Sequence, residues 1–222
     1  MNNVVANLSK LKASIPDNVK LVAVSKTKPE SDILEAYNTG HKIFGENKIQ
    51  DLVEKYENLP KDIEWHMIGH VQSNKVKYIA PFISLIQAVD SIKLLRVVNK
   101  EALKNNRVIN CLIQIYIAEE DTKFGSTLDQ TREIIKTKNE EKLDNVNFIG
   151  VMGMSTYTSD TNQVRNEFKQ LKNYFDQLKE EFFMENEGFK EISMGMSGDY
   201  QLAIEEGSTM IRVGSSIFGS RY

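Results

Sequence analysis

The stretch KLVAVSKTKPE, residues 20–30, joins an apolar run to two lysines, Lys26 and Lys28. The run Leu21–Val24 is typical of a buried strand, so Lys26 lies where that strand would end. A desolvated lysine amine can lose its proton and attack a carbonyl carbon. The alternative is a lysine whose ammonium group extends to water. Both interpretations fit this stretch taken alone.

Two glycine- and serine-containing turns, MGMSG at 194–198 and RVGSS at 212–216, could bind an anion. Such turns leave backbone N–H groups free where a helix begins, and the helix dipole favours negative charge there. We therefore expect Ser197, Gly214 and Ser215 to hold a phosphate group. The alternative for Ser197 is that it only caps the following helix.

Arg212 precedes the second of these turns. A guanidinium that is always charged would suit a phosphorylated ligand carrying an acceptor atom that stays unprotonated. The alternative is a structural ion pair. An amine nucleophile at Lys26, combined with a phosphate site, points to pyridoxal 5′-phosphate bound as a Schiff base.

The elements that must position these residues alternate between strands and helices. This pattern predicts an α/β fold, a closed (β/α)8 TIM barrel, with an open doubly wound sheet as the second choice. In such barrels the functional residues lie at the C-terminal ends of the strands. The eight expected strands begin at Leu21, Lys42, Glu64, Ser84, Ile109, Val146, Glu191 and Met210.

Helical spacing predicts helices before and between these strands. A short helix near 4–14 precedes the first strand, and the next runs over 31–40 with Ser31 as N-cap and Gly40 as C-cap. The segment 163–183 carries an aromatic stripe that we expect to face the core. We find no linker or composition break, so residues 1–222 are expected to form a single domain.

Composition excludes several classes of protein. The chain has 222 residues, is 41% hydrophobic and 27% charged, and carries a net charge of −3, which fits a folded protein with no general attraction to nucleic acid or to an anionic membrane. No apolar run is long enough to span a bilayer. The single Cys111 fits a reducing, cytoplasmic location as a buried thiol. The three histidines lack metal-ligand spacing, so no metal site is expected.

Five segments resemble the pyridoxal phosphate homeostasis proteins (YggS in bacteria, PROSC or PLPBP in animals). They are distributed over nearly the whole chain and read VAVSKTKP, FGENKIQD, WHMIGHVQSNK, GVMGM and ISMGMSGDYQLAIEEGSTMIRVGSSIFGSR. The resemblance implies a barrel of the alanine racemase N-terminal domain type with an extra N-terminal helix.

The resemblance also implies roles for individual residues. Lys26 would form the Schiff base with pyridoxal 5′-phosphate, and Ser197 with the Gly214–Ser215 backbone would hold its phosphate. Arg212 would face the pyridine nitrogen and discourage its protonation, which weakens the ring as an electron sink and suits cofactor carriage. The remaining cofactor-binding residues implied by the resemblance are Asn47, His66 and Met154. Lys28 is expected to be solvated or a secondary site for the aldehyde.

The sequence departs from the usual family pattern at two positions. Tyr116 replaces the usual asparagine of QVN, and His70 stands where proline is common; neither touches the lysine or phosphate elements.

We expect a non-catalytic protein that binds the cofactor as a monomer, with pyridoxal phosphate-dependent apoenzymes as candidate recipients. The alternative is an amino-acid racemase-like enzyme, but the chain ends directly after the last strand, where a racemase adds a second domain. A sugar-phosphate enzyme is disfavoured by the GEN and MGMSG matches.

Overall fold

The computed structural model describes residues 3–120 and 124–219, in which eight parallel strands close into a barrel in sequence order. Each strand pairs with the next along the chain, and β1 pairs with β8, so the expected closed barrel is confirmed and the open sheet is not formed. The strands are β1 (Lys20–Val24), β2 (Ile43–Glu46), β3 (Glu64–Met67), β4 (Leu85–Val89), β5 (Ile109–Gln114), β6 (Val146–Met152), β7 (Glu191–Ser193) and β8 (Met210–Val213).

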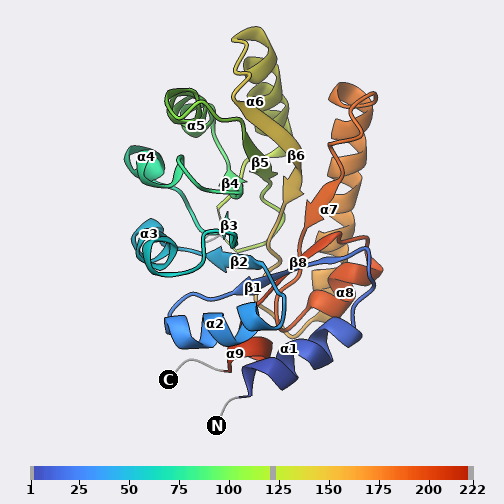
Figure 1. Cartoon of the computed structure of the whole chain (residues 1–222). Helices are drawn as coiled ribbons and strands as arrows, with labels where there is room; N and C mark the ends of the chain where they lie inside the picture. Colours follow the sequence, from blue (N-terminus) through green and yellow to red (C-terminus); the bar gives the residue numbers. More distant parts are fainter. Residues whose placement is uncertain (1–2, 121–123, 220–222) are drawn as a thin grey trace.

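Helices surround the barrel and cover the outer faces of its strands (Figure 1). They are α1 (Val4–Ala13), α2 (Glu30–Asn38), α3 (Ile49–Asn58), the 3-10 turn η1 (Ser73–Lys75), α4 (Val76–Ile79), α5 (Ile92–Lys104), α6 (Leu128–Glu140), α7 (Thr161–Phe182), α8 (Tyr200–Glu205) and α9 (Ser215–Phe218).

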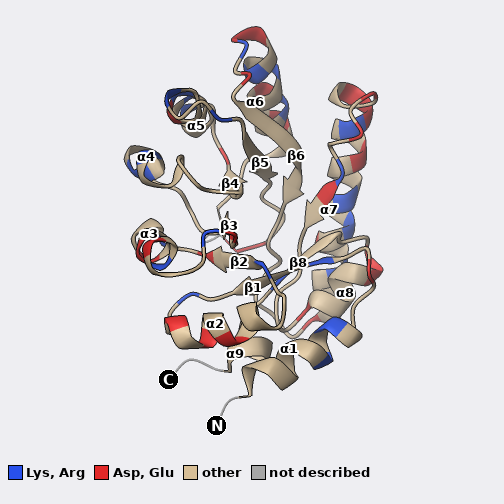
Figure 2. Cartoon of the chain, in the orientation of Figure 1, with Lys and Arg blue, Asp and Glu red and all other residues tan. Residues whose placement is uncertain are grey.

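Burial on both faces explains why the strands are apolar runs. All five residues of β4 are buried, as are four of the five in β1. Parallel strands covered by helices have no solvent-facing side, so their sequences do not alternate between apolar and polar residues. Charged residues of both signs instead lie mainly on the surrounding helices, as Figure 2 shows.

The predicted caps of α2 are partly wrong. Its N-cap is Pro29, and Ser31 is the second helical residue and exposed. Proline is suited to this boundary because its φ of −68° is preset and its ring lacks the N–H that a helix start leaves unpaired. At the other end Thr39 is the C-cap, and Gly40 follows with a φ of +87°, where glycine carries no steric penalty.

The other predicted helices are confirmed. In α7 the aromatic stripe faces the core through Phe168, Leu171, Phe175 and Leu178. The helix α1 lies beside α9 (Figure 1), and Asn7 Nδ2 donates a hydrogen bond to the Ile217 carbonyl at 3.1 Å. Among the helices of the described residues, none combines the length and apolar character that crossing a membrane requires.

Candidate functional site

The barrel brings the ends of β1 and β8 into direct contact. In the pairing register Val22 lies opposite Arg212 and Ala23 opposite Val213. One residue further on, a Cβ added to Gly214 would lie only 3.1 Å from the Val24 carbonyl oxygen, so glycine permits a close approach that another residue would disturb. The turn carrying Lys26 therefore lies beside the turn that begins at Gly214.

Lys26 is half-buried and lies in the turn that follows β1. The Ser25 N–H donates to the Gly45 carbonyl at 3.0 Å, and the Ser25 hydroxyl donates to Glu46 Oε1 at 2.6 Å toward the outer side of the barrel. The Lys28 N–H donates to the Ser25 carbonyl at 3.0 Å, which closes a turn around Lys26 and Thr27. Thr27 then takes a φ of +65°, a left-handed conformation that a β-branched residue rarely adopts.

A buried ion pair holds the residue before Lys26. Lys55 Nζ, on α3, donates to Glu46 Oε1 at 2.7 Å and to the Ser25 carbonyl at 2.8 Å. Burial raises the pKa of Glu46, and the Lys55 charge with its hydrogen bond opposes that shift. This pair was not predicted from the sequence. Its signal was a lysine at helical spacing between the buried Leu52 and Leu59.

Lys28 is not the solvated side chain that was expected. It is half-buried, and its Nζ donates to the Phe218 carbonyl at 2.9 Å, at the C-terminal end of α9. Cations are favoured at helix C-termini because the last carbonyl groups lack partners within the helix. The two lysines therefore differ in surroundings, since Lys28 is bound to the closing turn of the fold.

Ser197 joins the ends of β7 and β8. Its Oγ accepts a hydrogen bond from the Gly214 N–H at 3.2 Å. The interpretation of Ser197 as only a helix cap is wrong, because α8 begins at Tyr200 and its N-cap is Asp199. Ser215, exposed, is the first residue of α9. The structure thus brings together the three residues predicted to hold phosphate.

Asp199 stabilises the turn that follows β7. Its carboxylate accepts hydrogen bonds from the Met196 N–H at 2.5 Å and from the Ser155 hydroxyl at 2.8 Å. Gly195 has a φ of +95°, and a Cβ there would lie 2.6 Å from the Ala203 Cβ. The turn after β7 is therefore fixed by its own backbone and by a carboxylate, which leaves Ser197 pointing toward β8.

Arg212 is buried in the barrel, and the alternative of an ion-paired residue does not describe its contacts. Its Nη1 donates to Ser193 Oγ at 2.7 Å and its Nη2 to the Gly153 carbonyl at 2.9 Å, both of them neutral oxygens. Burial lowers the pKa of Arg212 to about 10, and the charge of Asp199 acts in the opposite direction. The guanidinium remains positive at neutral pH.

The three remaining predicted residues occupy different positions. Asn47 directly follows β2 and Met154 lies two residues beyond β6; both are half-buried at the C-terminal end of the barrel. His66 lies deeper, inside β3, where its Nδ1 is 3.0 Å from Gln87 Nε2. Burial lowers its pKa to about 3, and the charge of Lys20 contributes less. His66 is therefore neutral at physiological pH.

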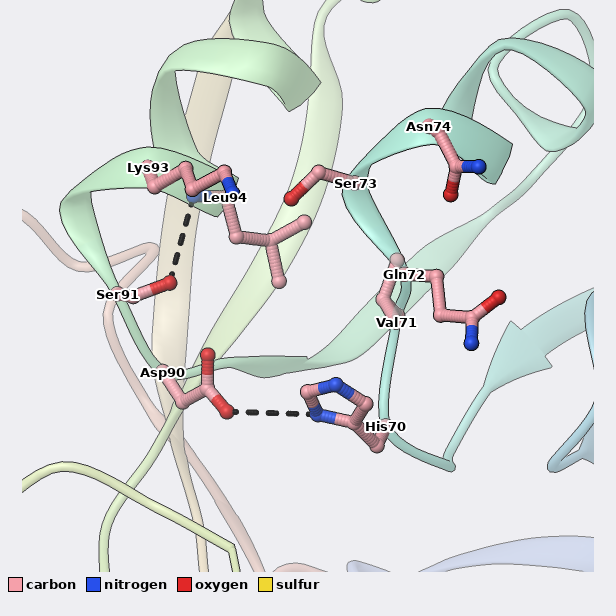
Figure 3. Close-up of a pocket in the computed structure, with 9 residues that line it drawn as sticks. All are labelled: His70, Val71, Gln72, Ser73, Asn74, Asp90, Ser91, Lys93 and Leu94. Carbon is pink, nitrogen blue, oxygen red and sulfur yellow. Dashed lines mark hydrogen bonds and ion pairs between the residues drawn. The ribbon is translucent and has the colours of Figure 1, made fainter.

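The two departures from the family pattern lie on the rim. His70 is exposed, stacks on Phe124 with ring centroids 4.5 Å apart, and places Nδ1 3.7 Å from Asp90 Oδ2. Figure 3 shows it facing Asp90 directly, and both residues line a cavity of about 470 Å³ between the loops that follow β3 and β4. The Tyr116 hydroxyl donates to the Glu120 carbonyl at 2.7 Å. Neither side chain is among the contacts of Ser197, Arg212 or Gly214.

Fold and site together define a (β/α)8 barrel of the kind that holds a phosphorylated ligand at the C-terminal end of its strands. A model of the alanine racemase N-terminal domain matches residues 1–222. The pyridoxal phosphate homeostasis protein of Aquifex aeolicus is 40% identical over 203 residues, which cover 91% of this chain and 87% of that protein. The chain belongs to the pyridoxal phosphate homeostasis protein family.

Solved structures agree with this assignment. PipY of Synechococcus elongatus with PLP bound is 30% identical, with a TM-score of 0.86 over 97% of this chain and 100% of that chain. An alanine racemase of Clostridium difficile is 14% identical, with a TM-score of 0.77 over 99% of this chain and 57% of that chain, and so shows the fold alone. The barrel of the alanine racemase N-terminal domain type is thereby confirmed.

Proposed function

We propose that this chain binds pyridoxal 5′-phosphate covalently at Lys26 and serves in its homeostasis. The observation that supports the proposal most directly is the contact between Val24 and Gly214, which sets the lysine turn beside the phosphate turn. The Lys26 amine adds to the aldehyde carbon, and loss of one water leaves a C=N bond. The relative named PipY, solved with PLP bound, supports the choice of ligand.

The residues present fit the proposed ligand. The hydroxyl of Ser197 and the backbone N–H groups at the start of α9 supply neutral donors for a phosphate, and the missing side chain of Gly214 lets this turn lie close to Val24. Arg212 would supply a charged donor for the ring nitrogen, and its guanidinium is held by hydrogen bonds to Ser193 and Gly153. Asn47, Met154 and His66 are proposed to line the ring.

Arg212 also supports carriage of the cofactor over catalysis. When bound in an enzyme, pyridoxal phosphate withdraws electrons from a substrate carbanion, and it does so best with a protonated ring nitrogen. A guanidinium at that position donates a hydrogen bond to the ring nitrogen, and its positive charge disfavours protonation of that nitrogen. We therefore propose that the chain holds the cofactor without turning over amino acids.

Borohydride trapping tests the site. The purified protein with pyridoxal phosphate should be yellow, and reduction should fix the cofactor to the peptide that contains Lys26. Lys26→Ala should remove both the colour and the adduct, and Lys28→Ala is the matched control that keeps them. An adduct found only on another lysine would refute the assignment.

A racemase-like enzyme is the second candidate, favoured by the shared barrel fold. Racemisation and decarboxylation assays across the amino acids separate the two functions. We expect no turnover above that of free pyridoxal phosphate. Robust turnover that Lys26→Ala abolishes would replace the carrier function with a catalytic one.

The proposal extends to cellular context. We propose one cofactor-binding domain that acts as a monomer in the cytoplasm and supplies pyridoxal phosphate-dependent apoenzymes. The buried Cys111, whose pKa is raised by desolvation, supports a stable thiol in a reducing compartment. Transfer to a purified apoenzyme, followed by recovery of that enzyme's activity, tests delivery; sedimentation of the loaded protein tests the monomer.

A further inference from the structure

A chain of four buried polar residues crosses the inside of the barrel. It runs from Arg212 on β8 to Ser193 on β7, then to Gln87 on β4 and His66 on β3. The three links measure 2.7 Å from Arg212 Nη1 to Ser193 Oγ, 2.7 Å from Ser193 Oγ to Gln87 Oε1, and 3.0 Å from Gln87 Nε2 to His66 Nδ1. Of these four residues, only Arg212 and His66 were predicted from the sequence to belong to the site.

The direction of every hydrogen bond in this chain follows from its first member. A guanidinium can only donate, so Ser193 Oγ accepts from Arg212 and its own proton is free to point onward. That proton requires an acceptor, which places the amide oxygen of Gln87 toward Ser193 and its amide nitrogen toward His66. His66 Nδ1 must then accept, which puts the proton of the neutral imidazole on Nε2.

A row of hydrogen-bonded polar residues is unusual in the interior of a barrel. Apolar side chains would fill the same space without the cost of desolvating polar groups. The three hydrogen bonds of this network offset the cost of desolvation. Buried networks whose polar groups are hydrogen-bonded hold their members in one arrangement. Gln87 is further restrained by a contact of 3.2 Å from Nε2 to Met210 Sδ, on the same strand as Arg212.

We propose that Ser193 and Gln87 are positioning residues: they fix the guanidinium of Arg212 and hold His66 as the neutral Nε2–H tautomer. The first part rests on the proposed role of Arg212 toward the ring nitrogen of pyridoxal phosphate. The second part concerns the protein alone.

The tautomer is tested on the protein without cofactor. In a ¹⁵N-labelled sample, imidazole nitrogen shifts distinguish an unprotonated Nδ1 from a protonated one, and His41→Asn with His70→Asn variants assign the His66 signals. We expect a single tautomer protonated on Nε2. Gln87→Met, of similar length but without the amide, should give a mixture of tautomers. A wild-type His66 protonated on Nδ1 would overturn the network, as would an unchanged signal in Gln87→Met.

The positioning of Arg212 is tested on the loaded protein. Ser193→Ala should raise the Kd for pyridoxal phosphate about tenfold, since leaving a buried donor unpaired costs on the order of 1.4 kcal/mol. It should also move the pH midpoint of the bound cofactor's absorption to higher pH, because a loosened Arg212 no longer suppresses ring protonation. Ser193→Thr, which keeps the hydroxyl, should restore both properties.

Ser208→Ala is the matched control for loss of a buried serine. Among the described residues, its hydroxyl has the carbonyl oxygens of Ile192, Met194 and Met210 within hydrogen-bond distance, so the substitution should leave the absorption midpoint unchanged. Equal effects of Ser208→Ala and Ser193→Ala would refute the positioning role. A protein that fails to bind pyridoxal phosphate would refute the proposed function, while the tautomer measurement would still decide the network.

Discussion

The Gly214 N–H donates a hydrogen bond to Ser197 Oγ across 3.2 Å, and this contact links the loops that follow β7 and β8. Each residue alone is unremarkable, a glycine at the start of a short helix and a serine in a turn. Joined, they lie beside the end of β1, because a Cβ on Gly214 would be 3.1 Å from the Val24 carbonyl oxygen. The phosphate of the proposed ligand would accept the hydroxyl proton of Ser197, which the hydrogen bond from the Gly214 N–H leaves available.

Ser197→Ala should therefore weaken binding in a phosphate-dependent way. A hydrogen bond to a charged group contributes about 1.5–3 kcal/mol, so we expect the Kd for pyridoxal 5′-phosphate to rise at least about tenfold. Pyridoxal, which lacks the phosphate, should bind the variant and the wild type equally. Absorbance titration measures both. Ser9→Ala, on the exposed side of α1, is the control. Equal losses for the two ligands would place the phosphate elsewhere.

The barrel was predictable because its signals are local. Runs such as Leu21–Val24 are apolar throughout, and that continuity follows from burial on both faces. The cap at Ser31 was wrong because a serine near a helix start was given more weight than Pro29, which fits the boundary through its own φ. Ser31 and Pro29 are both local signals for the start of this helix, and the prediction chose the wrong one of the two.

The interior of the site was harder to predict because its contacts join distant segments. Ser193 and Gln87 are separated by 106 positions in the sequence, and Lys55 is hydrogen-bonded to Ser25, which lies 30 positions before it. A sequence shows that Gln87 is a polar residue in an apolar strand, but its partner is defined only when the barrel closes. The roles of Asn47 and Met154 toward the cofactor stay predictions.

Lys28→Ala should reduce stability without affecting cofactor binding. Its ammonium group bonds the Phe218 carbonyl at the end of α9, and such a hydrogen bond contributes about 1 kcal/mol to the free energy of unfolding. Urea unfolding measures that loss, and the yellow colour of the loaded protein should remain. The exposed Lys100→Ala on α5 is the control for removal of a lysine. Loss of colour in Lys28→Ala would give this residue a part in binding.

The Glu46–Lys55 pair should be strongly coupled. Lys55→Met leaves a buried carboxylate without its partner, and breaking such a pair costs about 3–5 kcal/mol in the free energy of unfolding. Adding Glu46→Gln removes the uncompensated charge, so the double variant should be more stable than Lys55→Met alone. Urea unfolding of all four proteins gives the coupling energy.

A surface pair provides the comparison for that cycle. Lys172 and Asp176 are four residues apart on α7 and largely exposed, so Lys172→Met should cost no more than about 0.5 kcal/mol. If Lys55→Met were as mild as Lys172→Met, the buried pair would not hold Ser25 in place. The Lys26 turn would then owe its geometry to other contacts.

Acid should destabilise the protein through its buried histidines. Burial lowers the pKa of His41 to about 4, with the Lys12 charge adding to the effect, and that of His66 to about 3, against an ordinary value of 6.5. Between those values the unfolded chain binds protons that the folded chain does not. Stability therefore rises with pH in this window and falls as pH drops below about 6.5.

His41→Gln isolates one of these contributions. For a single histidine neutral in the fold, lowering the pH from about 7 to about 5 costs about 2 kcal/mol of unfolding free energy. The variant should therefore lose about 2 kcal/mol less than the wild type over that interval, as measured by urea unfolding at both pH values. His70→Gln, at the exposed rim, is the matched control and should keep the wild-type loss. Identical pH dependence in His41→Gln and wild type would show that His41 takes up its proton without unfolding.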